Sequence, residues 1–208
     1  ALNAWLTVDS IASKCQKNNG NWHPNPRNLL KCIMAEMKTS NSSWQAQLTE
    51  SLKRSTSKTE PRLALLGIGN ELNGDDAAGV WIARRLHSVL RDFPRFLVLD
   101  CGTVPENAFG DLRRFKPDFI LLVDAADIGG KPGKVKYIDP HDTSGFSASS
   151  HSLPFSVLSR YIENEFKCSI GLLGIQPASL EFDAGLSSEV MSSIFIVVKE
   201  LSKILLGY

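Results

Sequence analysis

Short apolar runs alternate with amphipathic helical patterns along residues 61–208, and this alternation limits the possible folds more than any other feature of the chain. Apolar runs of strand length occupy Leu63–Gly67, Phe96–Leu99, Phe119–Val123 and Ile170–Ile175. Helical patterns occupy Asp75–Arg91, Ala108–Phe115, Pro154–Phe166 and a long stretch that begins after Ser187. Because strands that alternate with helices usually build a parallel sheet covered on both faces, the sequence predicts a three-layer α/β fold with a mostly parallel central sheet.

One further predicted strand has a different pattern. Within Gly133–Ile138, the apolar Val135 and Tyr137 alternate with Lys134 and Lys136. Strict alternation is typical of a strand that buries one face and exposes the other to water. We therefore expect an antiparallel strand at one edge of the sheet.

Composition and charge exclude several classes of protein. The 208 residues are 43% hydrophobic, which is too apolar for a disordered chain. The net charge of +1 gives no reason to expect a nucleic-acid partner, and no apolar run approaches the roughly 20 residues of a membrane helix, so membrane insertion is not expected. The four cysteines lie far apart and form no C-x-x-C pair, which favours a cytoplasmic location.

The chain changes character near residue 60. Residues 1–60 hold three of the four tryptophans and show only short helical patterns, at Asn28–Lys38 and Trp44–Arg54. The polar stretch Ser55–Glu60 is typical of a linker. We predict an N-terminal extension of unknown role over residues 1–60 and a domain over residues 61–208 that folds without it.

Carboxylates follow three of the predicted strands. Asp75 and Asp76 come after the loop that leaves the first strand, Asp100 ends the second, and Asp124 directly follows the third. In open α/β sheets, ligands bind at the carboxyl ends of the strands. The sequence therefore predicts that these acids approach one edge of the sheet.

The glycine pair Gly67 and Gly69 at the end of the first strand invites comparison with dinucleotide sites. Their fingerprint requires a third glycine where this chain has Leu72, and two aspartates open the helix that would have to hold a phosphate. Nucleotide binding is therefore excluded, and we expect the two glycines to serve the geometry of the backbone.

Each candidate site residue also has a purely structural interpretation. Asp75 and Asp76 would interact favourably with the dipole at a helix N-terminus, Asp124 would suit a turn, and a loop histidine such as His151 is usually solvated. Taken together, two carboxylates and one imidazole form an O/O/N set that suits Ni²⁺, Zn²⁺ or Co²⁺. Sequence spacing alone does not distinguish this set from a chance triple.

The segment Gly67–Gly79, GIGNELNGDDAAG, closely resembles the signature G-x-G-N-x-x-x-x-D-D/E-x-x-G of hydrogenase maturation proteases, endopeptidases that trim the C-terminus of a NiFe-hydrogenase large subunit. The similarity continues in order through Leu99–Thr103, Val123–Ala125, His151–Leu153, Gly174–Pro177 and Gly185–Val190. The stretches Val104–Asn107 and Gly174–Pro177 most resemble the branch that serves hydrogenase 3-type enzymes.

This resemblance implies a site and a substrate. The metal ligands of the family correspond to Asp76, Asp124 and His151. In the family this site is thought to recognise nickel that is already seated in the precursor, so nickel is expected to arrive with the substrate. One departure is Cys101, where the family usually has glycine, and a side chain there is expected to restrict a loop beside the site.

We expect a peptidase that removes the C-terminal extension of a nickel-loaded large-subunit precursor. Neither Cys101 nor Cys168 has a neighbouring base in the sequence, so attack by water is favoured over a covalent intermediate. Asp76 and Asp124 are expected to act in catalysis, either as an aspartic-type pair or as ligands in metal-assisted hydrolysis. The alternatives are a non-catalytic nickel-checkpoint or chaperone-type binder of the large subunit and a metallo-aminopeptidase.

Overall fold

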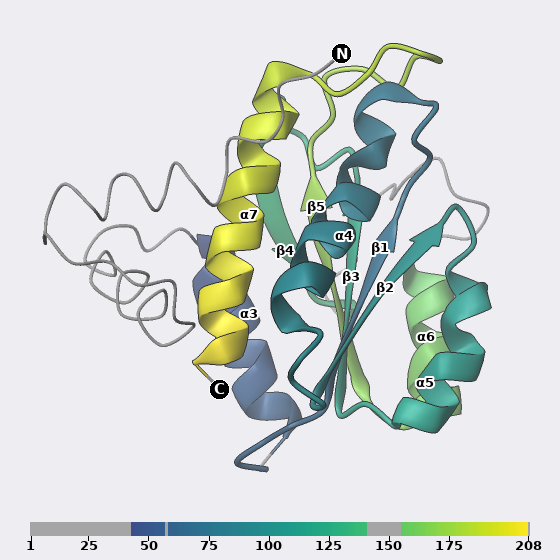
Figure 1. Ribbon diagram of the computed structural model, residues 1–208, viewed down its shortest axis with the longest axis vertical. Helices are drawn as coiled ribbons and strands as arrows, with labels where there is room; N and C mark the ends of the chain where they lie inside the picture. Colours follow the sequence, from purple (N-terminus) through teal and green to yellow (C-terminus); the bar gives the residue numbers. More distant parts are fainter. Residues whose placement is uncertain (1–42, 57, 141–154, 208) are drawn as a thin grey trace, which may run out of the picture. The chain divides into compact units, whose positions relative to one another are not determined.

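The computed structural model describes residues 43–56, 58–140 and 155–207, and Figure 1 shows their arrangement. Five strands form one sheet in the order β2-β1-β3-β5-β4. The strands are β1 (Leu63–Ile68), β2 (Phe96–Gly102), β3 (Phe119–Ala125), β4 (Val135–Ile138) and β5 (Ser169–Ile175). The helices are α3 (Ser43–Ser55), α4 (Ala78–Leu90), α5 (Phe109–Phe115), α6 (Phe155–Phe166) and α7 (Ser188–Leu206), with short 3-10 turns η1 (Gly74–Ala77) and η2 (Pro105–Ala108).

Helices cover both faces of this sheet, so the three-layer α/β prediction is confirmed. Helices α3, α4 and α7 lie on one face, and α5 and α6 lie on the other (Figure 1). Alternate residues of β1 serve the two layers: Leu63 and Leu65 pack under α3, α4 and α7, whereas Ala64 and Leu66 pack under α5 and α6. All six residues of β1 are buried, as expected of a central strand in a parallel sheet.

The pairing of the strands also follows the sequence pattern. The pairs β1–β2, β1–β3 and β3–β5 are parallel, and β4 pairs with β5 in the antiparallel direction at the edge of the sheet. Ser187 caps the N-terminus of α7, because the Val190 N–H donates to Ser187 Oγ at 3.3 Å. The helix expected from Asp75 begins instead as the 3-10 turn η1 and continues as α4.

Helix α3 packs with the sheet, although it lies before residue 60. Its residues Trp44, Leu48 and Leu52 recur every four positions, so they form one helical face, and all three are buried. The Tyr137 hydroxyl of β4 donates to Ser51 Oγ at 2.7 Å. The compact unit that contains the sheet begins at Asn41, about twenty residues before the boundary that composition suggests.

None of the helices in residues 43–56, 58–140 and 155–207 combines the length and the apolar character needed to cross a lipid bilayer. The segment Asn28–Lys38, where the sequence shows a helical pattern, lies outside the described residues.

Candidate active site

Two glycines allow α4 to lie directly against the ends of two strands. A Cβ on Gly79, in the first turn of α4, would lie 2.1 Å from the Val123 carbonyl oxygen of β3. A Cβ on Gly67 of β1 would lie 2.2 Å from the carbonyl oxygen of Gly79. Since no side chain fits at these distances, Gly67 has the backbone role expected for it. The turn η1, which precedes α4, is thereby held at the carboxyl ends of β1 and β3.

Asp76 lies in η1 and is only 2% exposed. Its Oδ2 accepts a hydrogen bond from the Asn70 N–H at 2.9 Å. Its carbonyl oxygen lies against Gly69, where φ is 149° and a Cβ would come within 1.8 Å of that oxygen. These two contacts hold the Asp76 carboxylate at the end of β1.

Asp124 is the next-to-last residue of β3 and is 4% exposed. Strands β1 and β3 are neighbours, and Val123 is paired with Gly67, so Asp124 lies one residue further toward the carboxyl edge. The turn η1 contacts β3. Adjacent strands lie about 4.7–4.9 Å apart, so the structure brings two buried carboxylates to neighbouring strand ends, as the sequence predicts.

The third expected ligand, His151, lies outside the described residues, and its part in the site stays a prediction. Within residues 43–56, 58–140 and 155–207, no group of three or more His, Cys, Asp or Glu side chains is arranged to hold a metal ion. The two buried carboxylates Asp76 and Asp124 supply oxygen donors, and one imidazole added to them would complete a set that Ni²⁺ accepts.

Asp75 has a larger structural role than the helix-dipole interaction expected for it. Its carboxylate is 1% exposed and accepts four hydrogen bonds. The donors are the Ala178 N–H at 2.7 Å, the Ser179 N–H at 3.2 Å, and the Ser187 N–H and hydroxyl at 2.7 and 2.9 Å. Asp75 thus ties the loop after β1 to the loop after β5. Sequence reasoning missed these bonds because their partners are 103 to 112 residues away.

Arg84 of α4 joins the loop after β1 to the carboxyl end of β2, and sequence reasoning did not single it out. Its guanidinium donates to both carboxylate oxygens of Glu71, at 2.6 and 2.7 Å, and to Asp100 Oδ2 at 2.7 Å. The hydrogen bond with Glu71 is the main cause of a raised Arg84 pKa. Asp100 is therefore part of a structural ion-pair cluster, and an arginine within a helical pattern offered no signal of it.

Neither cysteine in the described part of the chain has the environment of a nucleophile. Burial raises the pKa of Cys101 to about 12, with a further contribution from the Asp100 charge. Burial also raises the pKa of Cys168 to about 12. A nucleophilic cysteine requires a lowered pKa, so these thiols are unsuited to attack on a peptide bond. Direct attack by water therefore stays the prediction from the sequence.

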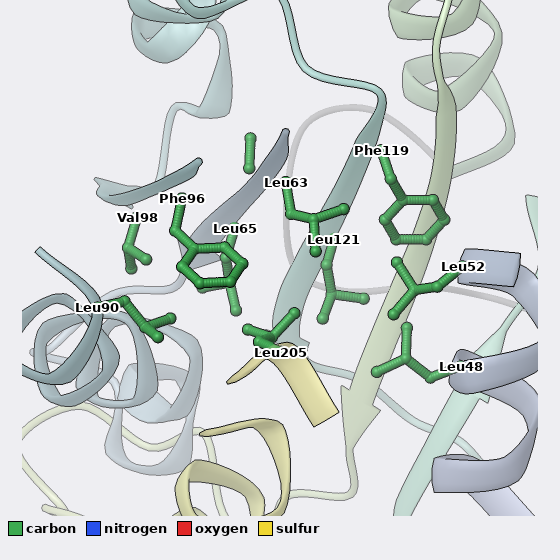
Figure 2. Close-up of a pocket in the computed structure, with 11 residues that line it drawn as sticks. Leu48, Leu52, Leu63, Leu65, Leu90, Phe96, Val98, Phe119, Leu121 and Leu205 are labelled. Atoms are coloured by element: carbon green, nitrogen blue, oxygen red, sulfur yellow. The ribbon is translucent and has the colours of Figure 1, made fainter. Parts of the chain in front are cut away.

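An apolar pocket lies at the amino ends of the parallel strands, opposite the carboxyl edge that holds the acids (Figure 2). The first residues of three strands, Leu63, Phe96 and Phe119, line it together with Leu48 and Leu52 of α3. Its walls are almost entirely hydrocarbon, with no acid, base or amide side chain to orient a reacting group. The pocket is therefore a property of the core and separate from the candidate active site.

Comparison with known proteins indicates a family for this chain. A family model described as hydrogenase maturation protease matches residues 80–204. The hydrogenase 3 maturation protease of Escherichia coli K12 is 32% identical over 141 residues, which cover 66% of this chain and 86% of that protein. A protein of Methanocaldococcus jannaschii, named a hydrogenase maturation protease only provisionally, is 33% identical over 150 residues, covering 69% of this chain and 88% of that protein.

A solved structure extends the likeness to the fold. The crystal structure of a NiFe-hydrogenase maturation protease from Thermococcus kodakarensis KOD1 aligns with a TM-score of 0.65 and 35% sequence identity. The alignment covers 74% of this chain and 98% of that one. The match to the family model and the identity to these relatives show that this chain belongs to the hydrogenase maturation protease family.

Proposed function

We propose that this chain is an endopeptidase that removes the C-terminal extension from the nickel-loaded precursor of a NiFe-hydrogenase large subunit. The observation that carries the proposal is the pair of buried carboxylates, Asp76 and Asp124, at neighbouring strand ends in a member of this family. Reducing conditions, as in the cytoplasm, suit a chain whose Cys101 and Cys168 form no disulfide.

The buried acids have the chemistry that hydrolysis requires. A carboxylate within reach of a water molecule accepts its proton as the oxygen attacks the scissile carbonyl. The bond from the Asn70 N–H holds Asp76 in one orientation, and β3 holds Asp124, so neither acid has to be ordered when substrate binds. Burial removes competing solvent and strengthens the electrostatic effect of both groups on the reacting atoms.

Nickel enters this proposal as part of the substrate. A divalent ion held by the precursor would polarise the scissile carbonyl and mark the precursor as loaded. Asp76, Asp124 and His151 would contact that ion as an O/O/N set. Three protein ligands leave coordination positions open, as required of a site that touches a metal held by another protein.

The test is the release of a C-terminal peptide from purified precursor, measured by mass spectrometry with and without bound nickel. We expect release from the nickel-loaded precursor and none from the metal-free form. Asp76→Asn, Asp124→Asn and His151→Ala should each lower the rate by about 10²–10⁴-fold while the far-ultraviolet circular dichroism is unchanged. Asp92→Asn, at a side chain that is 88% exposed, is the matched control and should cleave at the wild-type rate.

Three results would contradict the proposal. Tight binding of the precursor without release of a peptide would identify a checkpoint or chaperone-type binder. A stoichiometric zinc ion held by the free protein, together with hydrolysis of short peptides, would identify a metallo-aminopeptidase. Wild-type cleavage by Asp76→Asn would remove the carboxylate pair from the mechanism.

A further inference from the structure

Three large apolar side chains are exposed on two loops at the carboxyl edge of the sheet. Phe182 is 75% exposed and Leu180 is 42% exposed, both in the loop after β5, and Leu72 in the loop after β1 is 57% exposed. We call these three residues the docking rim. Single exposed apolar residues are ordinary, whereas several on adjoining segments are typical of a surface that binds a partner.

Hydrogen bonds hold the two loops of the docking rim side by side. The Asp183 N–H donates to the Leu72 carbonyl oxygen at 2.7 Å. The Asp75 N–H donates to the Ser179 carbonyl oxygen at 3.0 Å, and the Asp75 carboxylate binds both ends of the loop after β5. The exposed side chains are therefore presented by an ordered backbone, which lowers the entropy cost of binding.

The same two loops carry negative charge only. Residues 69–76 and 176–189, which extend from the loops into η1 and the first two residues of α7, together contain six acidic residues and no Lys or Arg. The Glu71 carboxylate is neutralised by Arg84. In the described part of the chain, neither Glu181 nor Asp183 forms an ion pair. An apolar rim beside exposed acids favours a partner whose apolar side chains stand next to Lys or Arg.

We propose that the docking rim binds a segment of the large-subunit precursor near its cleaved bond, and that this segment combines apolar and basic side chains. The inference rests on the proposed function. The Leu72 N–H donates to Asn70 Oδ1 at 3.0 Å, and the Asn70 N–H donates to Asp76 Oδ2 at 2.9 Å, so a segment bound at the rim lies beside this candidate catalytic acid. Contacts at the rim would strengthen the precursor complex equally before and during cleavage, and such contacts lower KM without changing kcat.

The first test compares KM and kcat for the nickel-loaded precursor. Phe182→Ser and Leu72→Ser should raise KM by about 10-fold or more and leave kcat within about twofold, since they remove binding and not chemistry. Ile196→Ser on α7 is the matched control, because Ile196 is 55% exposed and lies outside both loops, and its KM should equal that of the wild type. An unchanged KM in both rim variants would overturn the proposal.

The second test addresses charge. Glu181→Lys should lower the association rate constant for the precursor by about 10-fold at low salt and flatten its dependence on ionic strength. Glu50→Lys, on the exposed side of α3, is the control and should leave the rate unchanged. If Glu181→Lys shows the same salt dependence as the wild type, the claim that the bound segment carries basic side chains is wrong.

Two outcomes separate this inference from the proposed function. If the wild type binds the precursor and releases no peptide, the proposed endopeptidase activity fails, and the docking rim is then judged by the Kd of Phe182→Ser for the precursor. If Phe182→Ser converts a dimer into a monomer in light scattering and leaves KM and Kd unchanged, the rim is a contact between two copies of this chain. That result overturns the docking proposal while cleavage persists.

Discussion

The central sheet has different residues at its carboxyl edge, where the parallel strands end, and at its amino edge, where they begin. At the carboxyl edge, Asp75, Asp76 and Asp124 are buried, and glycines let backbone atoms approach one another closely. At the amino edge, the first residues of β1, β2 and β3 meet α3 around a pocket of leucine and phenylalanine side chains. The difference shows that one edge stabilises the fold by burying hydrocarbon, while the other positions polar groups.

Burying carboxylates at the carboxyl edge and burying leucines at the amino edge also differ in their cost in free energy. A buried carboxylate is tolerated only when donors satisfy it, and Asp75 obtains four of them from the opposite loop. Buried leucines need no such partners and contribute through the area removed from water. Changes at the amino edge should therefore alter stability alone, whereas changes at the carboxyl edge should alter processing more than stability.

The largest effect is expected on removing α3. A chain that starts at Pro61 loses the burial of Trp44, Leu48 and Leu52, worth roughly 5–9 kcal/mol at about 1.5–3 kcal/mol for each side chain. A small domain has a stability of about 5–15 kcal/mol, so we expect this chain to be largely unfolded. Urea unfolding should show this, with a chain that starts at Asn41 as the control. Equal urea midpoints for the two chains would support the domain boundary near residue 60 that composition suggests.

A single substitution in the same layer should have a smaller effect of the same kind. Leu48 is fully buried and lines the pocket, so Leu48→Ala should lower the free energy of unfolding by about 2–5 kcal/mol. The processing rate per folded molecule should not change, because Leu48 is at the amino edge. Val157→Ala, at a half-exposed position on α6, is the control for losing apolar volume. A reduced kcat in Leu48→Ala would show that the amino edge also affects processing, contrary to this prediction.

Asp75→Asn tests the carboxyl edge. An amide keeps one acceptor oxygen and turns an NH₂ group toward N–H donors, so we expect a loss of about 1–3 kcal/mol in unfolding free energy. A role limited to the helix dipole would cost only about 0.3–1 kcal/mol. Because the loop after β5 is then released, KM for the precursor should rise as well. A stability loss within the smaller range, with KM unchanged, would argue that the dipole interaction is sufficient.

The smallest effect is expected at Cys101. Its thiol pKa of about 12 leaves about one molecule in ten thousand as thiolate at pH 8, so iodoacetamide at that pH should not inhibit processing. Cys101→Ser should retain the wild-type rate. Rapid inactivation by the reagent, prevented by the same substitution, would point to a covalent intermediate instead.

The sequence predicted the layers, the strands and the antiparallel edge because each depends on local periodicity. It also predicted that Asp76 and Asp124 reach one edge, since parallel strands end together. The partners of Asp75 and the Arg84 cluster depend on contacts between distant segments, which periodicity does not encode. The place of α3 was missed for a related reason: its apolar face is short, and its partner surface is formed by strands that follow it in the chain.

The bonds that Asp75 forms with Ala178, Ser179 and Ser187 close the loop between β5 and α7 at its base. A loop whose two ends are fixed can change in length at little cost, because closure entropy grows only slowly with the number of residues. The residues between Ser179 and Ser187 can therefore change in number and sequence while the two ends of the loop stay bound to Asp75. Insertions or new sequences there would change the docking rim, which includes Leu180 and Phe182, and leave the acids where they are.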